Sequence, residues 1–137
     1  MIEGKKALFT NDSFYQVFRD RNIDGMENLW SQDAPLLCIH PGQQALTDRA
    51  DIMNSWRAIL GSEQCPDICF CVSEIVQHNN IFLIVCREWV DDQPKFRLLG
   101  TNGYIQEGDE YRMIFHQSGP VPPLTDDLLD FDPGLKH

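Results

Sequence analysis

The chain has 137 residues, of which 42% are hydrophobic and 10% aromatic, so we expect one globular domain with its own core. Its formal net charge of −10 disfavours binding to nucleic acid and to anionic membrane surfaces. The longest purely apolar run, residues 81–86, is as long as a strand and too short to cross a bilayer. The first residues show no apolar signal segment and the cysteine count of five is odd, so we expect reduced thiols and a cytoplasmic protein.

Helix signals dominate the first sixty residues. Apolar side chains at 3–4 spacing predict a helix over residues 2–21, although the polar residues 11–13 could mark a second start inside it. A short helix is expected over residues 23–30. A third is expected over residues 49–60, where Asp48 or its neighbour Thr47 would cap the beginning and a glycine follows the end.

Strand signals dominate the second half of the chain. Four strands follow one another with turn residues between them, which predicts an antiparallel meander. Two shorter strands are expected earlier, between the second and third helices. Helices followed by a long sheet define an α+β domain, and a sheet this long must curl around the helices to bury one face. The expected strands are 35–39, 45–46, 67–77, 81–90, 96–106 and 111–118.

Several segments together resemble the SnoaL-like branch of the NTF2-like superfamily. The resemblance covers about residues 11–120, and no single motif in it is diagnostic of an activity. The segments that carry it are Phe14-Tyr15, Met26-Glu27-Asn28-Leu29-Trp30-Ser31, Cys38-Ile39-His40-Pro41-Gly42, Ile52-Met53-Asn54-Ser55-Trp56, Gly100-Thr101-Asn102-Gly103-Tyr104 and His116-Gln117-Ser118.

The resemblance implies an NTF2-like (cystatin-like) cone, in which a curved antiparallel sheet wraps around three N-terminal helices and leaves an open-ended cavity. It also implies a homodimer formed through the sheet. Residues 1–120 would form this domain, and residues 121–137 an acidic, proline-containing C-terminal tail. Relatives include isomerases, cyclases, dehydratases and members without known catalysis. Many similar sequences carry paired histidines near the end of the last strand; this chain departs from that pattern, because it has Phe115-His116 there.

Two histidines are the candidate catalytic residues. His40 directly follows a buried strand and could act as a general acid or base, because the pKa of a free histidine lies near neutrality. The alternative role for His40 is a hydrogen bond to the turn before the third helix. His116 shares one face of the last strand with Ile114 and Ser118; its alternative role is that of a core histidine held by a neighbour.

Tyr15, Trp30, Trp56 and Asn102 are the candidate ligand-binding residues. The three aromatic residues are expected in the core and cavity wall, where each polar ring atom needs a hydrogen-bond partner. Asn102 could orient a carbonyl or carboxylate group. A three-residue turn at residues 108–110 would place it opposite His116, whereas a two-residue turn would place it opposite the preceding phenylalanine.

Glu88 and Trp89 lie on opposite faces of one strand, so only one of them can face the cavity. An inward Glu88 would have a raised pKa and could serve as an acid or base. We expect Trp89 to face inward instead, because Glu88 could then pair with Arg97 across the strands.

The cysteines near residue 69 lack the spacing of a zinc site. The chain also shows no phosphate-binding glycine loop and no metal-binding His-Glu helix. We therefore expect no metal and no cofactor. Three functions stay open: a binding domain for a small apolar or aromatic ligand; a cofactor-independent isomerase, dehydratase or lyase that uses His40 or His116; and a dimerisation or scaffold module.

Overall fold

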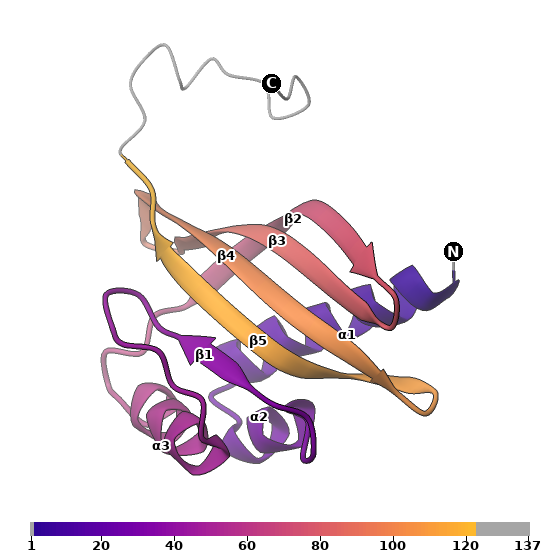
Figure 1. Cartoon of the computed structure of the whole chain (residues 1–137). Coiled ribbons are helices and arrows are strands. Elements are labelled where there is room, and N and C mark those ends of the chain that lie inside the picture. Colours follow the sequence, from indigo (N-terminus) through magenta and orange to yellow (C-terminus); the bar gives the residue numbers. More distant parts are fainter. Residues whose placement is uncertain (1, 123–137) are drawn as a thin grey trace.

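The computed structural model describes residues 2–122, so almost all of the predicted tail lies outside the described residues. Three helices and five strands form two layers: the sheet curves over α1, while α2 and α3 lie beside β1 (Figure 1). This arrangement confirms the predicted α+β class and the curved sheet around N-terminal helices. The elements are α1 (Ile2–Arg19), α2 (Ile23–Leu29), β1 (Leu37–Ile39), α3 (Arg49–Leu60), β2 (Ile68–His78), β3 (Ile81–Val90), β4 (Gln93–Glu107) and β5 (Glu110–Pro120).

Local signals explain where the helices begin. The side chain of Asn22 accepts a hydrogen bond from the backbone N–H of Gly25 at 3.0 Å and so caps α2. The predicted cap Asp48 does the same for α3, accepting from Ala50 N at 2.7 Å. α1 runs without a break through the polar residues 11–13, so no second start exists. Asn11 is fully buried, which explains why a weak helix former stands in the middle of this helix.

Arg49 joins the beginning of α3 to the end of α2. Its guanidinium donates to the backbone carbonyls of Glu27, Trp30 and Ser31, at 2.7, 3.2 and 2.8 Å. These are carbonyls in and just after the last turn of α2, where intrahelical partners run out and the helix dipole favours a positive charge. Arg49 thereby fixes the angle between the two helices that support β1. No helix in residues 2–122 is long and apolar enough to cross a membrane.

The sheet has the strand order β1-β5-β4-β3-β2, which confirms the predicted meander of the last four strands. β1 is an edge strand and runs parallel to β5, so the sheet is mixed, in contrast to the fully antiparallel sheet expected from the sequence. A parallel neighbour was hard to foresee because α3 and two strand pairings separate β1 from β5 along the chain. The predicted 45–46 strand is reduced to an isolated bridge between Leu46 and Cys38.

The pairing of β4 with β5 settles the register that the sequence left open. The turn contains only two residues, since Glu107 pairs with Glu110. A bulge then inserts an unpaired Ile114, because Tyr104 pairs with Met113 and Gly103 with Phe115. The bulge shifts the register by one residue and brings Asn102 opposite His116.

The expectation that Trp89 faces the helices is wrong. Glu88 is the inward residue and is 3% exposed. Arg97 does not pair with it: the pairing places Arg97 opposite Trp89 on the outer side, where the guanidinium lies 5.5 Å from the Trp89 ring centre. A cation over an aromatic face thus replaces the expected ion pair, and the carboxyl of Glu88 is left in the core.

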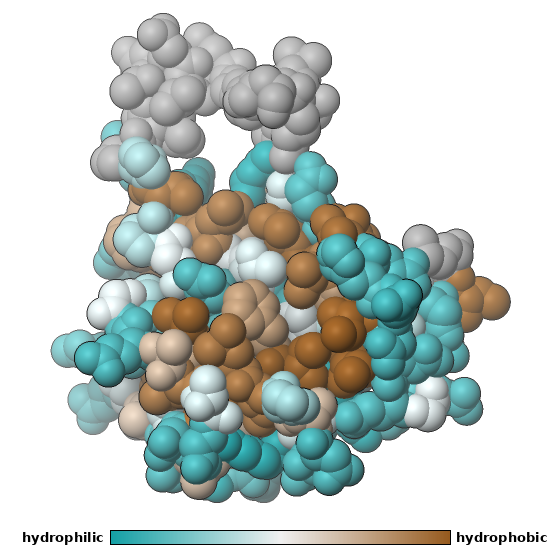
Figure 2. All heavy atoms as spheres, in the orientation of Figure 1, coloured by the Kyte–Doolittle hydropathy of each residue, from teal (hydrophilic) through white to brown (hydrophobic). Residues whose placement is uncertain are grey.

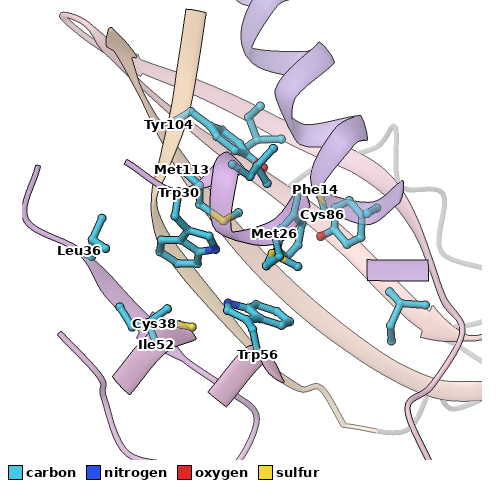
Figure 3. Close-up of a cluster of buried hydrophobic side chains, with 14 of the residues drawn as sticks. Phe14, Met26, Trp30, Leu36, Cys38, Ile52, Trp56, Cys86, Tyr104 and Met113 are labelled. Carbon is cyan, nitrogen blue, oxygen red and sulfur yellow. The ribbon is translucent and has the colours of Figure 1, made fainter. Parts of the chain in front are cut away.

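The core fills the space between the inner face of the sheet and the three helices. Figure 3 shows Trp30 and Trp56 side by side in it, with Met26 and Phe14 beside them. Inner residues of neighbouring strands pair in rows. One row runs Ile84, Asn102, His116 and Cys38 across β3, β4, β5 and β1. This row brings residues far apart in sequence to one place under the helices.

Candidate functional site

A pocket of about 220 Å³ opens between α3, the loop after β1 and the inner face of β3, β4 and β5. We call it the histidine pocket, because both predicted catalytic histidines line it. Most of its wall is apolar and its deep polar residues are His40, Glu88, His116 and Ser118. The lining residues are Phe18, His40, Pro41, Gln43, Trp56, Ile59, Pro66, Ile68, Glu88, Leu98, His116 and Ser118.

The ring of His40 is held by α3, and its backbone carbonyl accepts a hydrogen bond from Gln43 N at 3.0 Å in the turn before that helix. Its Nε2 lies 2.8 Å from the hydroxyl of Ser55, and its ring lies edge-on to the Trp56 indole at 4.8 Å between centres. Only 3% of the residue is exposed, so His40 lies deep in the pocket. Burial lowers the pKa of His40 to about 4, and the ring is therefore neutral at pH 7.

His116 lies next to His40, with 6.2 Å between the ring centres. Its Nδ1 is 2.7 Å from Oδ1 of Asn102, the residue opposite it in the sheet. Burial, and to a smaller extent the nearby His40, lowers the pKa of His116 to about 3. Both rings are therefore neutral at pH 7 and offer an unprotonated nitrogen.

The carboxyl group of Glu88 is almost completely buried. Ser118 donates a hydrogen bond to its Oε1 at 2.5 Å, and the Tyr15 hydroxyl donates to its Oε2. Burial raises the pKa of Glu88 above its ordinary value, and these two hydrogen bonds oppose the rise. The carboxyl lies against Gly100, where a Cβ atom would come within 2.5 Å of Oε2. A glycine in β4 is thus what makes room for the acid.

A polar network extends behind the pocket. Nδ2 of Asn102 donates to Oδ1 of Asn11 at 2.9 Å and to the Tyr15 hydroxyl at 3.1 Å. Tyr104 also donates to Oδ1 of Asn11, at 2.7 Å. Asn102 therefore uses all its polar atoms on protein partners and acts on His116 as a positioning residue. Asn11 fixes the other end of the network from α1.

The predicted site residues divide into three groups. His40, His116 and Trp56 line the histidine pocket. Tyr15 and Asn102 lie directly behind its wall, bonded to residues that line it. Trp30 lies in the core outside the lining and carries an indole N–H without a partner among the described residues, as does Trp56.

The structure adds Asn11 and Ser118, which were not among the predicted site residues, and it places Glu88 on the inner face, the alternative that was not favoured. A signal existed for Glu88, since it continues the alternation of Phe82, Ile84 and Cys86, all of which are fully buried. Asn11 stands on the apolar stripe of α1, which was a second signal. Among residues 2–122, no group of three or more potential ligands is arranged to hold a metal ion. The side chains that line the histidine pocket, two neutral histidines and a carboxyl group, are of types that take part in proton transfer and hydrogen bonding.

Proteins of known structure share this fold. A candidate dehydratase of the NTF2-like family from Streptomyces avermitilis is 18% identical and superposes with a TM-score of 0.74, over 86% of this chain and 95% of its own. A ketosteroid isomerase-like protein from Erwinia carotovora atroseptica is 9% identical, with a TM-score of 0.67 over 87% and 96%. The domain is thus an NTF2-like, cystatin-like fold, as a further neighbour described as cystatin-like also indicates.

A more similar structure comes from Thiobacillus denitrificans. It is a candidate calcium/calmodulin-dependent protein kinase type II association domain, 26% identical, with a TM-score of 0.76 over 82% of this chain and 93% of its own. The family of SnoaL-like domains matches residues 8–122. The chain therefore belongs to the SnoaL-like domain family, as its sequence segments predicted. No curated protein matches it.

Proposed function

We propose that the histidine pocket binds a small ligand with an apolar or aromatic body. The supporting observation is a hollow of about 220 Å³ whose wall is mostly apolar, yet whose depth holds two histidines and a carboxyl group. Apolar walls with a few placed polar groups are typical of ligand sites. The volume lies below the ~300–1,000 Å³ usual for drug-sized ligands, so the ligand is small, about the size of one substituted ring.

Filling the pocket from α3 tests this proposal. Ile59→Trp should weaken binding of toluene or phenol at least about tenfold, because the indole would occupy the space of the ligand. Ala58→Trp is the matched control: the position is the next one along the same helix, is exposed and does not line the pocket. Dissociation constants come from chemical-shift titrations of the ¹⁵N-labelled protein. Binding of neither probe to the unmodified chain would contradict the proposal.

Acid–base catalysis without a cofactor is the second candidate. It is favoured by a carboxyl whose pKa is raised, beside two histidines that are neutral at pH 7 and so each hold an unprotonated nitrogen. Two structural neighbours are described as a dehydratase candidate and as ketosteroid isomerase-like. Both descriptions are compatible with proton transfer at carbon.

Deuterium uptake tests this candidate before a substrate is known. In D2O the chain should accelerate exchange of the acidic C–H groups of a panel of small ketones that also carry a hydroxyl group. His40→Gln or His116→Gln should reduce the acceleration by about 10²-fold or more, in line with the usual contribution of a general base. Replacement of the exposed His78 by Gln should leave it unchanged. Exchange at the buffer rate with the unmodified chain would remove the candidate.

We further propose a homodimer formed through the outer face of the sheet. One paired row, Val76, Leu83, Gly103, Phe115 and Leu37, crosses all five strands on this side. Apolar residues gather over these strands in Figure 2. Neighbouring Leu99 is 45% exposed, which is high for a leucine within a sheet. The similar structure from Thiobacillus denitrificans is described as an association domain, and that description is consistent with self-association of this chain.

A charge on this face should separate the dimer. Leu99→Glu is expected to change the mass measured by sedimentation equilibrium from two chains to one, because the carboxylate would be buried without a partner. Phe9→Glu is the control, since Phe9 is 73% exposed on α1, which covers the opposite face of the sheet. A single-chain mass for the unmodified protein at micromolar concentration would exclude this dimer.

We place the protein in a reducing compartment, the cytoplasm. All five cysteines are free thiols, including the exposed Cys71 and the partly exposed Cys69. Exposed free thiols persist where glutathione and thioredoxin keep them reduced. Location of a fluorescently tagged chain by microscopy checks this assignment.

A further inference from the structure

The hydrogen-bond network fixes which atoms of the histidine pocket can accept a proton and which can donate one. The Tyr15 hydroxyl has one proton and gives it to Oε2 of Glu88, so the Tyr15 oxygen can only accept from Asn102. The Asn102 atom that faces Tyr15 must therefore be the amide nitrogen.

This orientation determines the tautomer of His116. With the amide nitrogen of Asn102 turned to Tyr15, its oxygen Oδ1 faces His116 at 2.7 Å. An amide oxygen only accepts, so Nδ1 of His116 carries the ring proton and donates it. The other ring nitrogen, Nε2, is left with a free lone pair. It has no partner among the described residues, and it is not one of the fully enclosed polar atoms, so it reaches the pocket that His116 lines.

The hydrogen bonds of Ser55 determine the tautomer of His40. The Ser55 hydroxyl donates its single proton to the backbone carbonyl of Ile52 at 2.6 Å. Its oxygen can then only accept, so Nε2 of His40 is the protonated nitrogen of that ring. Nδ1 of His40 holds the free lone pair, and again no described residue bonds to it.

The remaining polar groups add no donor to the deep part of the pocket. Ser118 gives its proton to Glu88. Trp56 has an unpartnered N–H, but the atom is fully enclosed, and in Figure 3 it points toward Trp30. Gln43 lies at the exposed mouth. The deep wall thus presents lone pairs only, from His40, His116 and the carboxyl oxygens.

We propose that the ligand of the histidine pocket is a small hydroxyl compound, a phenol or an alcohol, whose O–H donates to Nδ1 of His40 or Nε2 of His116. This inference rests on the proposed binding function and names the chemical class of its ligand. A ligand whose only polar group is a carbonyl would place an acceptor against acceptors and lose the hydrogen bonds it makes in water. Such a ligand is rejected by the same wall.

A neutral hydroxyl fits the pocket better than an ammonium group. The wall around the histidines is apolar, formed by residues such as Phe18, Ile68 and Leu98, and removing a charge from water into such a wall is costly. The carboxyl of Glu88 already accepts two hydrogen bonds from the protein. An aromatic hydroxyl would also have the Trp56 indole as a neighbour for its ring.

Four probes of similar size test the inference: phenol, toluene, benzaldehyde and benzylammonium. Phenol should bind the unmodified chain about tenfold more tightly than toluene or benzaldehyde, the effect expected of one well-made hydrogen bond. His116→Phe and His40→Phe remove one lone pair each, and at least one of them should lose this preference while still binding toluene. Dissociation constants again come from chemical-shift titrations.

The outcomes separate this inference from the binding function on which it rests. Equal affinity for phenol and toluene, or tighter binding of benzaldehyde or benzylammonium, overturns the hydroxyl class and leaves a ligand pocket in place. Binding of no probe overturns both. The ¹⁵N shifts of the free protein at pH 7 give a second, ligand-independent readout. They should show protonated Nε2 in His40 and protonated Nδ1 in His116; the opposite tautomers would overturn the inference.

Discussion

The free energy of unfolding should fall steeply as the pH drops from about 6.5 to 4. Histidines in the unfolded chain bind protons below about pH 6.5, whereas in the folded chain burial lowers the pKa of His40 to about 4 and that of His116 to about 3. The unfolded state therefore binds more protons throughout this interval. Unfolding is favoured as the pH falls, and the stabilisation is fully present only above the unfolded pKa.

The free energy of unfolding lost through the two histidines is of the same order as the total stability of a domain of this size. Two protons taken up on unfolding correspond to a slope of about 2.7 kcal/mol per pH unit, and the two shifts together to about 8 kcal/mol once the pH is below the folded pKa of both histidines. A domain of this kind has a total of roughly 5–15 kcal/mol. Glu88 acts in the opposite direction: because its folded pKa is raised, its contribution grows as the pH falls toward its unfolded value. The net slope should therefore correspond to the uptake of between one and two protons on unfolding.

Urea unfolding at a series of pH values between 7.5 and 4.5 measures this slope. His40→Gln and His116→Gln should each make it shallower by about one proton, whatever they do to the stability at pH 7.5. Gln77→Asn should leave the slope unchanged, because position 77 in β2 is exposed and carries no titratable group in either chain. A slope that neither pocket substitution alters would show that the two buried histidines do not control acid unfolding.

The sequence predicted those elements whose own residues determine them. The bounds of α3 and β3 match the structure, because a cap and a closing glycine delimit the helix and turn residues delimit the strand. The neighbour of β1 could not be predicted in this way. β1 is three residues long, and its parallel partner β5 begins about seventy residues later, so no local signal connects them.

The site was predicted in part for a related reason. His40 was selected because it directly follows a buried strand, and His116 because it shares one face of the last strand with Ile114 and Ser118. The meeting of Asn102 with His116 depends on a bulge at Ile114, and a bulge of one residue leaves no composition signal in an apolar strand. Glu88 was assigned to the wrong face because a charge pair with Arg97 was given more weight than the alternation of its own strand.

Gly100→Ala should lower the free energy of unfolding by about 2–4 kcal/mol, although strands ordinarily favour alanine over glycine. The new Cβ would lie 2.5 Å from Oε2 and 2.9 Å from Cδ of Glu88, closer than atoms can approach. The carboxyl is the flexible end of its side chain, but Ser118 and Tyr15 hold it in place. Moving it leaves buried donors without acceptors, which costs about 1–3 kcal/mol for each group.

Two comparisons isolate this cause. Gly119→Ala in β5 should change stability by less than about 0.5 kcal/mol, because no atom lies within 4 Å of the added Cβ. In a Glu88→Ala background the clash partner is gone, so Gly100→Ala should then cost less than about 1 kcal/mol. The double-mutant cycle would thus give a coupling energy of about 1–4 kcal/mol between positions 88 and 100.

The same cycle connects the fold to the pocket. If position 100 is a glycine because the acid needs the space, Gly100→Ala should also disturb phenol binding, since the displaced carboxyl belongs to the wall that the ligand meets. Gly119→Ala should bind phenol like the unmodified chain. Additive stability changes at positions 88 and 100, measured by urea unfolding at pH 7.5, would contradict the account. They would mean that Glu88 adapts freely and that the glycine has no part in holding an acid in the core.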